Sequence, residues 1–260
     1  MLNIVTATLN RCTLLERLYL SLLEQSDLEF KWVVVDDGSS DGTRGFLNAV
    51  ATAKDRKFEF EYHIHERNRG KHVAINSAIS FCKYEYTMIV DSDDLLYPDA
   101  VECVKDLINC GVRFCIFPTM QGVPFEYAGT SVSYRQYFKI SQDCTRVVPT
   151  SEMAKRPFPD CVDEFFLTEA YLWSALHRRN CFHAIGRRVV QVEYQCDGLS
   201  SRYKSLVFRN PKGSIKTAIK VILMPTFGLS YFKFVSLHLL LGITGLIYAV
   251  FTSKKSANRA

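Results

Sequence analysis

The residues best suited to chemistry are three carboxylates, Asp91, Asp93 and Asp94, which directly follow the apolar run 87–90. The run predicts a buried strand. Acids crowded at a strand end repel one another unless a cation or hydrogen-bond donors offset the repulsion. Because Mg²⁺ is usually held by one or two carboxylates together with substrate phosphates, a divalent cation is one interpretation. The other is a solvated turn before a helix whose first turn favours acids.

Two further acids, Asp36 and Asp37, follow a second apolar run, Trp32–Val35. Gly38 permits a tight turn, and Asp41 can cap the helix that follows. Turn formation and capping explain Gly38 and Asp41, but they do not explain the adjacent pair of acids. A carboxylate at this place can accept hydrogen bonds from a nucleotide base or from ribose hydroxyls.

Lys71 opens a predicted helix directly after Asn68, Arg69 and Gly70. A cation at a helix N-terminus opposes the macrodipole, typically at a cost of ~0.3–1 kcal/mol. The same place is favourable when an anion such as a diphosphate sits there. Lys71 is therefore either a phosphate contact or an ordinary solvated side chain.

Glu169 lies in an aromatic and apolar stretch that begins at Phe165. Burial raises the pKa of a carboxyl group and makes its ionised form a better base. Asp163 and Glu164 compete for this role, although both are better suited to being exposed acids in the first turn of a helix.

The elements that must position these residues alternate along the first 118 residues. Strands are expected at Asn3–Ala7, Phe30–Asp36, Phe58–His65, Tyr86–Asp91 and Arg113–Phe117, and helices at Thr13–Gln25, Thr43–Ala53, Lys71–Phe81 and Asp99–Cys110. This alternation predicts an α/β fold with a mostly parallel central sheet and helices on both faces. Ligands of such sheets bind beyond the carboxyl ends of the strands, where the polar residues gather.

The pattern breaks down between Pro118 and Pro159, where prolines, glycines and aromatics follow no clean period. Short strands and loops that shape a specificity region are expected there. A helix at Glu164–His177 and a strand at Val189–Tyr194 are predicted to follow.

Composition is that of a folded globular protein, with 260 residues, 48% hydrophobic and 23% charged. The net charge of +5 is mild, and no basic stripe interleaved with aromatics indicates nucleic acid. Nine cysteines without a CxxC pair favour a reduced, cytosolic protein over a disulfide framework or a zinc site. The first residues read as a strand, without the basic and long apolar regions of a signal peptide.

The C-terminal part differs, because the nineteen residues Phe234–Thr252 contain His238 as their only strongly polar side chain. This length is at the short end of what spans a bilayer, which needs ~20 apolar residues. Basic residues flank both ends, and a single crossing would place one basic flank outside. A helix lying in the cytoplasmic leaflet is therefore favoured, with a buried helix or an oligomer contact as the alternative.

Taken together and in order, these stretches resemble the family 2 glycosyltransferases of the GT-A, Rossmann-like fold. The opening strand and loop 4–10 and the segment Val33–Thr43 look like the family's nucleotide loop and VVDDGSxDGT segment. Residues 68–78 look like its NxGxxxAxNxA segment, and Asp91–Asp94 like its DxD-type signature. Thr168–Leu176 aligns with the Glu-Asp segment, so that Glu169 replaces the catalytic Asp. Residues 194–213 resemble a subgroup that builds bacterial surface polysaccharides.

The resemblance implies an inverting glycosyltransferase that moves a sugar from a nucleotide-diphosphate sugar, with UDP expected, to a hydroxyl of a glycan or lipid-linked glycan. It implies that Glu169 is the base and that Asp93 binds Mg²⁺ or Mn²⁺. The residues implied in the nucleotide and phosphate pocket are Thr6, Thr8, Asn10, Asp37, Lys71 and Asp91. The expected location is the inner face of the cytoplasmic membrane, peripherally bound, and the oligomeric state is left open.

Three parts are expected: residues 1–117 bind the nucleotide-sugar, 118–210 complete the same domain with the acceptor and catalytic residues, and 211–260 form a membrane-associating tail. A sugar-phosphate nucleotidyltransferase is an alternative, but its phosphate loop after the first strand is usually rich in glycine, whereas the loop 6–11 has none. A non-catalytic scaffold that binds nucleotide-sugar is a second alternative.

Overall fold

The computed structural model describes residues 1–119, 125–137, 139–140, 143–161, 163–193, 195, 198–222 and 229–257. Within these residues an eight-stranded sheet runs in the spatial order β3-β2-β1-β4-β8-β6-β9-β7, and β10 pairs separately with β5. The strands are β1 (Leu2–Thr8), β2 (Phe30–Asp36), β3 (Glu59–Ile64), β4 (Tyr86–Ile89), β5 (Leu95–Leu96), β6 (Cys115–Pro118), β7 (Ser131–Val132), β8 (Cys144–Pro149), β9 (Phe182–Ala184) and β10 (Val190–Gln191).

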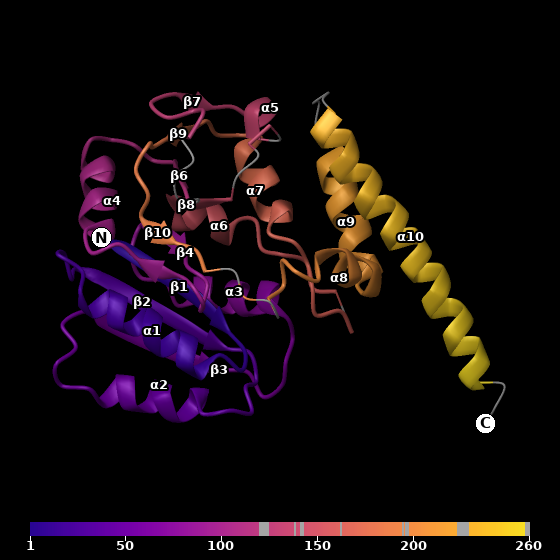
Figure 1. Ribbon diagram of the computed structural model, residues 1–260, viewed down its shortest axis with the longest axis horizontal. Coiled ribbons are helices and arrows are strands. Elements are labelled where there is room, and N and C mark those ends of the chain that lie inside the picture. Colours follow the sequence, from indigo (N-terminus) through magenta and orange to yellow (C-terminus); the bar gives the residue numbers. More distant parts are fainter. Residues whose placement is uncertain are drawn as a thin grey trace.

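Helices cover both faces of this sheet, and the last three helices form a separate layer beside it (Figure 1). They are α1 (Cys12–Leu23), α2 (Thr43–Thr52), α3 (Lys71–Ser80), α4 (Ala100–Asn109), α5 (Tyr134–Tyr137), α6 (Thr150–Ala154), α7 (Ala170–His177), α8 (Tyr203–Arg209), α9 (Pro211–Ile222) and α10 (Leu229–Ala257).

The first half is a parallel sheet, as its alternating pattern predicts. Strands β3, β2, β1 and β4 are all parallel, and the register places Thr8 opposite Asp36 and Asp36 opposite Ile64. Parallel strands end at the same edge, so the loops after β1, β2, β3 and β4 meet there.

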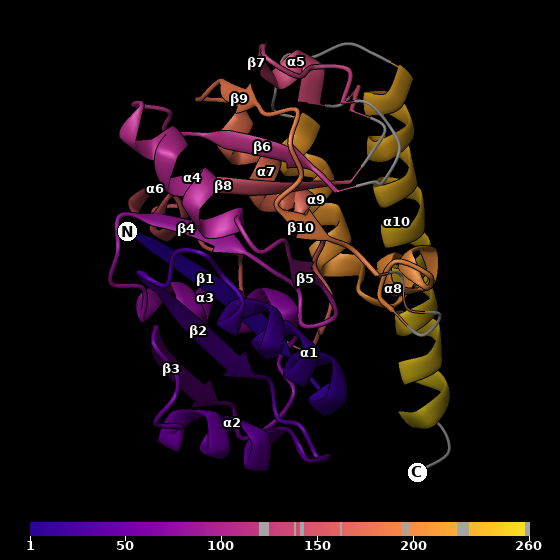
Figure 2. The same cartoon turned by 60° about the vertical axis from the view of Figure 1, so that its left-hand side comes forward.

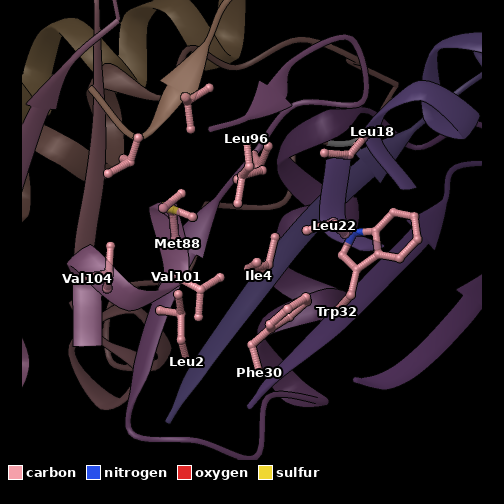
Figure 3. Close-up of a cluster of buried hydrophobic side chains, with 14 of the residues drawn as sticks. Leu2, Ile4, Leu18, Leu22, Phe30, Trp32, Met88, Leu96, Val101 and Val104 are labelled. Atoms are coloured by element: carbon pink, nitrogen blue, oxygen red, sulfur yellow. The ribbon is translucent and has the colours of Figure 1, made fainter. Parts of the chain in front are cut away.

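The core lies on both faces of these strands because neighbouring residues of a strand point to opposite sides. Ile4 and Trp32 pack with helices α1 and α4 on one face (Figure 3). Val5 and Val33 pack with Ala74 of α3 on the other. Burial on both faces explains why the run Trp32–Val35 is continuously apolar rather than alternating.

The second half adds antiparallel strands. β8 lies between β4 and β6 and is antiparallel to both, whereas β6 and β9 are parallel. The short strands β7 and β8 lie in the stretch that lacks a sequence period, as expected for that region.

The predicted helix Glu164–His177 is wrong in its first six residues, because α7 begins at Ala170. The carboxylate of Glu164 instead accepts hydrogen bonds from the amides of Lys212 and Gly213, both at 2.7 Å, in the first turn of α9. Of the predicted strand Val189–Tyr194, the structure forms β10 at Val190–Gln191, and Tyr194 lies outside the described residues.

The C-terminal helices α9 and α10 pack along each other beside the α7 edge of the domain (Figure 2). The segment Tyr231–Ala249 of α10 is long and apolar enough to cross a membrane by length and composition, with a mean hydropathy of 1.6 and 22% of the segment buried. His238 faces the protein, where its Nε2 lies 3.0 Å from the hydroxyl of Tyr203 in α8.

Candidate active site

The loops at the carboxyl edge of the parallel strands are tied together by direct hydrogen bonds. The amide of Asn10, after β1, donates to Oγ of Ser39 at 2.8 Å, and the amide of Ser40 donates to Oδ1 of Asn10 at 2.8 Å. Asn10 has a positive φ of 53°. Its side chain thus joins the first two loops of this edge.

Asp37 joins the loop after β2 to the loop after β3. Its Oδ1 accepts from Nδ1 of His65 at 2.7 Å and from the amide of Arg69 at 3.0 Å, and its Oδ2 accepts from the amide of Gly70 at 2.7 Å. Only 3% of Asp37 is exposed. The carboxylate therefore fixes the turn that presents Lys71.

Two glycines make this approach of the loops sterically possible. Gly38 has φ of 84°, and a Cβ there would lie 2.7 Å from the carbonyl carbon of Arg67. Gly70 has φ of 96°, and a Cβ there would lie 2.4 Å from the carbonyl oxygen of Phe165. Both positions combine a left-handed backbone with no room for a side chain.

Lys71 is the centre of the charged arrangement. Its Nζ lies 2.7 Å from Asp91 and 2.7 Å from Oε1 of Glu169. Burial acts to lower the pKa of Lys71, but the charges of Asp91 and Glu169 outweigh it and the pKa is raised. The ammonium is therefore always charged, and two carboxylates share it.

The two carboxylates respond differently to this shared cation. Burial raises the pKa of Asp91, and the charge of Lys71 offsets only part of that rise. For Glu169 the effect of burial is outweighed by the charge and hydrogen bond of Lys71, so its pKa is lowered. Glu169 is thus ionised, and with 30% of its side chain exposed it is open to a substrate.

Glu169 is held at both of its oxygens. Nε1 of Trp173 donates to Oε2 at 3.0 Å, while Oε1 faces Lys71. The guanidinium of Arg146, from β8, lies over the ring of Trp173 at 5.0 Å from its centroid. Glu169 stands at the N-cap of α7, where a negative charge is favourable.

The competing acids do not share this position. Glu164 caps α9 through both of its oxygens, as described above. Asp163 is exposed and has a positive φ of 65°. Of the three candidate bases, Glu169 alone lines the pocket beside Asp91.

Three carboxylates, here called the acidic cluster, follow β4: Asp91, Asp93 and Asp94. Asp91 connects this cluster to Lys71. Burial and the charges of Asp91 and Asp93 raise the pKa of Asp94 to about 8. No described residue donates a hydrogen bond to the side chain of Asp93. Within the described residues no group of three or more His, Cys, Asp or Glu side chains is arranged to hold a metal ion by itself. Crowded carboxylates with an unused oxygen set nevertheless fit a hard cation that takes its remaining ligands from phosphate.

A pocket extends from Asp91 and Asp94 of the acidic cluster to Glu169. The empty space between its walls is about 390 Å³, which includes the part that is open to solvent. Its described lining is mainly polar and comes from both halves of the chain: Ile89, Asp91, Asp94, Thr119, Asp143, Cys144, Thr145, Arg146, Glu169, Trp173 and Val192. This mixture of carboxylates, hydroxyls and one guanidinium suits a hydroxyl-rich, charged ligand.

Thr6 and Thr8 lie away from this pocket. The hydroxyl of Thr6 accepts a hydrogen bond from Nε1 of Trp32 at 3.1 Å inside the core, and Thr6 is fully buried. Thr8 is 3% exposed, and its hydroxyl has no partner among the described residues. Of the residues expected around the nucleotide and catalytic centre, the structure brings together Lys71, Asp91 and Glu169, and it places Asn10 and Asp37 in the neighbouring loops. Asp93 follows Asp91 by two residues but is not among the described residues that line the pocket, which Asp94 lines instead.

Sequence reasoning missed Arg146, Trp173 and Asp143 as site residues. Trp173 stands at i+4 from Glu169, so the helical period itself was a usable signal. Arg146 and Asp143 lie in or beside β8, in the stretch without a period, where no comparable signal existed.

The sequence matches the model of a known protein family. The model of the glycosyl transferase family 2 matches residues 3–144, more than half of the chain. The chain therefore belongs to glycosyl transferase family 2.

Curated relatives come from bacteria. The chain is 24% identical over 195 residues to GalNAc(5)-diNAcBac-PP-undecaprenol beta-1,3-glucosyltransferase of Campylobacter jejuni, covering 70% of this chain and 61% of that protein. It is 28% identical over 151 residues to the putative teichuronic acid biosynthesis glycosyltransferase TuaG of Bacillus subtilis, covering 54% and 57%. With chondroitin synthase of Pasteurella multocida it shares 30% identity over 47% of this chain and 12% of that protein. The chain thus spans less than two thirds of these relatives.

Solved structures share the fold. TarS 1–349 of S. aureus, in complex with UDP-GlcNAc, superposes with a TM-score of 0.67 at 17% identity, covering 92% of this chain and 71% of that one. The mannosyltransferase PcManGT of Pyrobaculum calidifontis, in complex with GDP-Man and Mn²⁺, gives a TM-score of 0.57 at 17% identity, covering 98% and 79%. The expected GT-A-like α/β fold is confirmed.

Proposed function

We propose that this protein is an inverting, metal-dependent glycosyltransferase that moves a sugar from a nucleotide-diphosphate sugar to a hydroxyl of a glycan in bacterial polysaccharide synthesis. The observation that carries the proposal is the joint ion pair of Lys71 with Asp91 and Glu169. It places a cation suited to phosphate beside the carboxylate best suited to be the base.

The donor site is formed by the carboxyl edge of the parallel strands. Lys71 binds the diphosphate, and Asp91 faces the ribose. Asn10 and Asp37 act by fixing the loops around the nucleotide, since the carboxylate of Asp37 already holds three donors. Thr6 and Thr8 support β1 from within the core. The structurally similar TarS was solved with UDP-GlcNAc, which favours a uridine nucleotide. PcManGT was solved with GDP-Man, so a guanine nucleotide is the second candidate.

Asp93 and Asp94 would hold Mg²⁺ or Mn²⁺, which supplies charge stabilisation for a departing diphosphate when it is bound. Asp94, whose pKa is raised to about 8, would have to release its proton to solvent before its carboxylate could act as a ligand. The protein itself holds the carboxylate oxygens of Asp93 and Asp94 close together and leaves them available to a cation.

The base is Glu169. In the unliganded protein Lys71 lowers its pKa, which makes it a weak base. When Lys71 turns its charge to the diphosphate, the pKa of Glu169 rises, and its carboxylate accepts the proton of the acceptor hydroxyl. That oxygen forms the new bond to the anomeric carbon while the bond to the diphosphate oxygen breaks. A single displacement from the opposite face inverts the anomeric configuration.

The acceptor that fits best is a lipid-linked glycan, met at the inner face of the cytoplasmic membrane. The Campylobacter jejuni relative is a glucosyltransferase named for GalNAc(5)-diNAcBac-PP-undecaprenol, a lipid-linked glycan. Exposed apolar residues along α10 support peripheral contact with a bilayer: Leu240 is 64% exposed, and Ile243 and Ile247 about half exposed.

Calorimetric titration tests the donor proposal. UDP, GDP and dTDP are titrated into the protein with Mn²⁺ and with EDTA. We expect one nucleotide, UDP, to bind in the presence of Mn²⁺ and to lose most of its affinity with EDTA. Equal binding with and without the metal would contradict the metal-dependent site, and no binding of any nucleotide would contradict the donor site.

A further inference from the structure

A second polar cleft lies where α6, α7 and α9 end, at the opposite end of α7 from Glu169. It contains about 670 Å³ of space, counted out to the open solvent, and all but one of its lining residues are cationic: Lys155, Arg156, Arg178, Arg179 and Lys220, with Ala175. We call it the basic cleft. Neither the donor site nor the proposed chemistry uses it.

Its positive charge is poorly neutralised. Glu152 pairs with Lys155 at 3.1 Å and with Arg156 at 2.6 Å, and it is the one carboxylate within 4.0 Å of these cations among the described residues. Arg178 and Arg179 are exposed and have no such partner there. Three helix C-termini contribute at most about −1.5 charges together, at about −0.5 each, so a clear positive excess remains. An anion with several oxygens would neutralise it.

Helix α9, which lines the basic cleft through Lys220, also carries two exposed apolar side chains. Along α9, Lys212, Lys216 and Lys220 recur every four residues and form one basic row. Beside this row Ile219 and Ile222 are 48% and 44% exposed. A helix with a basic row next to exposed apolar side chains is typical of a helix lying at a membrane surface.

We propose that the basic cleft binds the phosphate head group of an anionic membrane lipid, with Arg178 and Arg179 as the principal contacts. This rests on the membrane association proposed above and locates its polar part. The guanidinium groups offer paired N–H donors that match phosphate oxygens, and Lys220 adds a further charge. Ile219 and Ile222 meet the acyl region beside the head group.

The cleft and the candidate active site can be filled at the same time. They lie at the two ends of α7, whose eight residues span about 12 Å. A lipid held in the cleft therefore orients the domain on the bilayer without covering Glu169.

The test is co-sedimentation of the full chain with vesicles of phosphatidylcholine alone and with 30% phosphatidylglycerol. Replacing both arginines, Arg178→Gln with Arg179→Gln, should weaken binding to the anionic vesicles about 30-fold, since each basic residue near such a surface contributes about 1 kcal/mol. The matched control removes two exposed cations from the turn before β3, Lys54→Gln with Lys57→Gln, and should change binding by less than about twofold. Arg178→Lys with Arg179→Lys keeps both charges but loses the paired N–H donors, so its binding should fall between that of the wild type and that of the Gln variant.

Wild-type affinity of the Arg178/Arg179 pair variant for anionic vesicles would overturn the proposal, and so would an equal loss in the control. Binding of inorganic phosphate that depends on both arginines, without vesicle binding, would assign the cleft to a soluble phosphate instead. Preferential binding of a duplex oligonucleotide would assign it to nucleic acid. If the wild type binds no vesicle at all, the membrane association itself fails, while sugar transfer measured in solution tests the catalytic proposal separately.

Discussion

Nζ of Lys71 lies 2.7 Å from Oε1 of Glu169, although one residue begins α3 and the other caps α7 in the second half of the chain. The same ammonium lies 2.7 Å from Asp91 at the end of β4. Two carboxylates therefore share one cation. A diphosphate that competes for Lys71 changes the environment of the base, which links donor binding to proton abstraction.

Replacing Lys71 by Met should weaken nucleoside diphosphate binding by about 10- to 100-fold, because a charge-assisted hydrogen bond contributes about 1.5–3 kcal/mol. Titration calorimetry with UDP measures the loss. Lys83→Met is the matched control, since Lys83 is a solvent-exposed lysine paired with Glu59. Equal affinities of the Lys71 variant and the wild type would show that Lys71 does not contact the diphosphate.

Replacing Trp173 by Phe removes the indole donor to Glu169 and keeps an aromatic ring beneath Arg146. Loss of this hydrogen bond destabilises the ionised form of Glu169 and raises its pKa. The acidic limb of the kcat/KM pH profile should therefore move to higher pH by about half to one pH unit. Trp32→Phe is the control, because it removes a comparable indole hydrogen bond to Thr6 in the core. A limb that stays in place in Trp173→Phe, or moves equally in both variants, argues against Glu169 as the titrating base.

Asp94 should make the metal-free protein less stable as pH rises. Its folded-state pKa is raised to about 8, whereas the unfolded chain releases this proton near its ordinary value of 3.8. Between these values the folded state holds more protons, so stability falls with rising pH. Asp94→Asn should flatten the fall in Tm between pH 5 and pH 8.5 in EDTA, whereas Asp106→Asn, an exposed change on α4, should not. Parallel Tm curves for wild type and Asp94→Asn would refute the raised pKa.

Gly111 and Gly70 have similar positive φ angles, but only Gly70 lacks room for a side chain. Replacing each by Ala therefore distinguishes the cost of backbone strain from the cost of a steric clash. Gly111→Ala introduces a side chain at φ 85° into open space, so it should cost about 1 kcal/mol of unfolding free energy. Gly70→Ala adds a contact at 2.4 Å with the carbonyl oxygen of Phe165 and should cost about 1–3 kcal/mol more. Urea unfolding measures both. Similar losses of unfolding free energy in the two variants would mean that the loop carrying Lys71 can move away from the added methyl group at no energetic cost.

Much of the parallel half could be predicted because its signals are local. The continuous apolar run Trp32–Val35 reflects burial on both faces of β2, and Gly70 before Lys71 marks the start of α3. The gathering of polar loops follows from parallel strands alone. Alternation along β1 also places Thr6 on the side of Ile4, toward the core, which could have kept Thr6 out of the expected pocket.

The rest depends on contacts between distant residues. Glu164 caps α9 through Gly213, a partner 49 positions away, so the local pattern wrongly extended the helix of α7 to include it. Arg146 lies over the ring of Trp173 because β8 inserts between β4 and β6. No hydrophobic period in the sequence around β8 predicts this insertion. The division into parts at residues 117 and 210 and the individual site roles stay predictions.

The most direct test of the central claim is single-turnover sugar transfer by Glu169→Gln, measured together with its affinity for UDP. The amide cannot accept the acceptor's proton, so the rate should fall by about 10²–10⁴-fold. Nucleotide affinity should be unchanged or higher, because Lys71 loses a competing partner. Asp163→Asn, an exposed neighbour, serves as the control and should keep its rate. A Glu169→Gln rate close to that of the wild type would contradict the account.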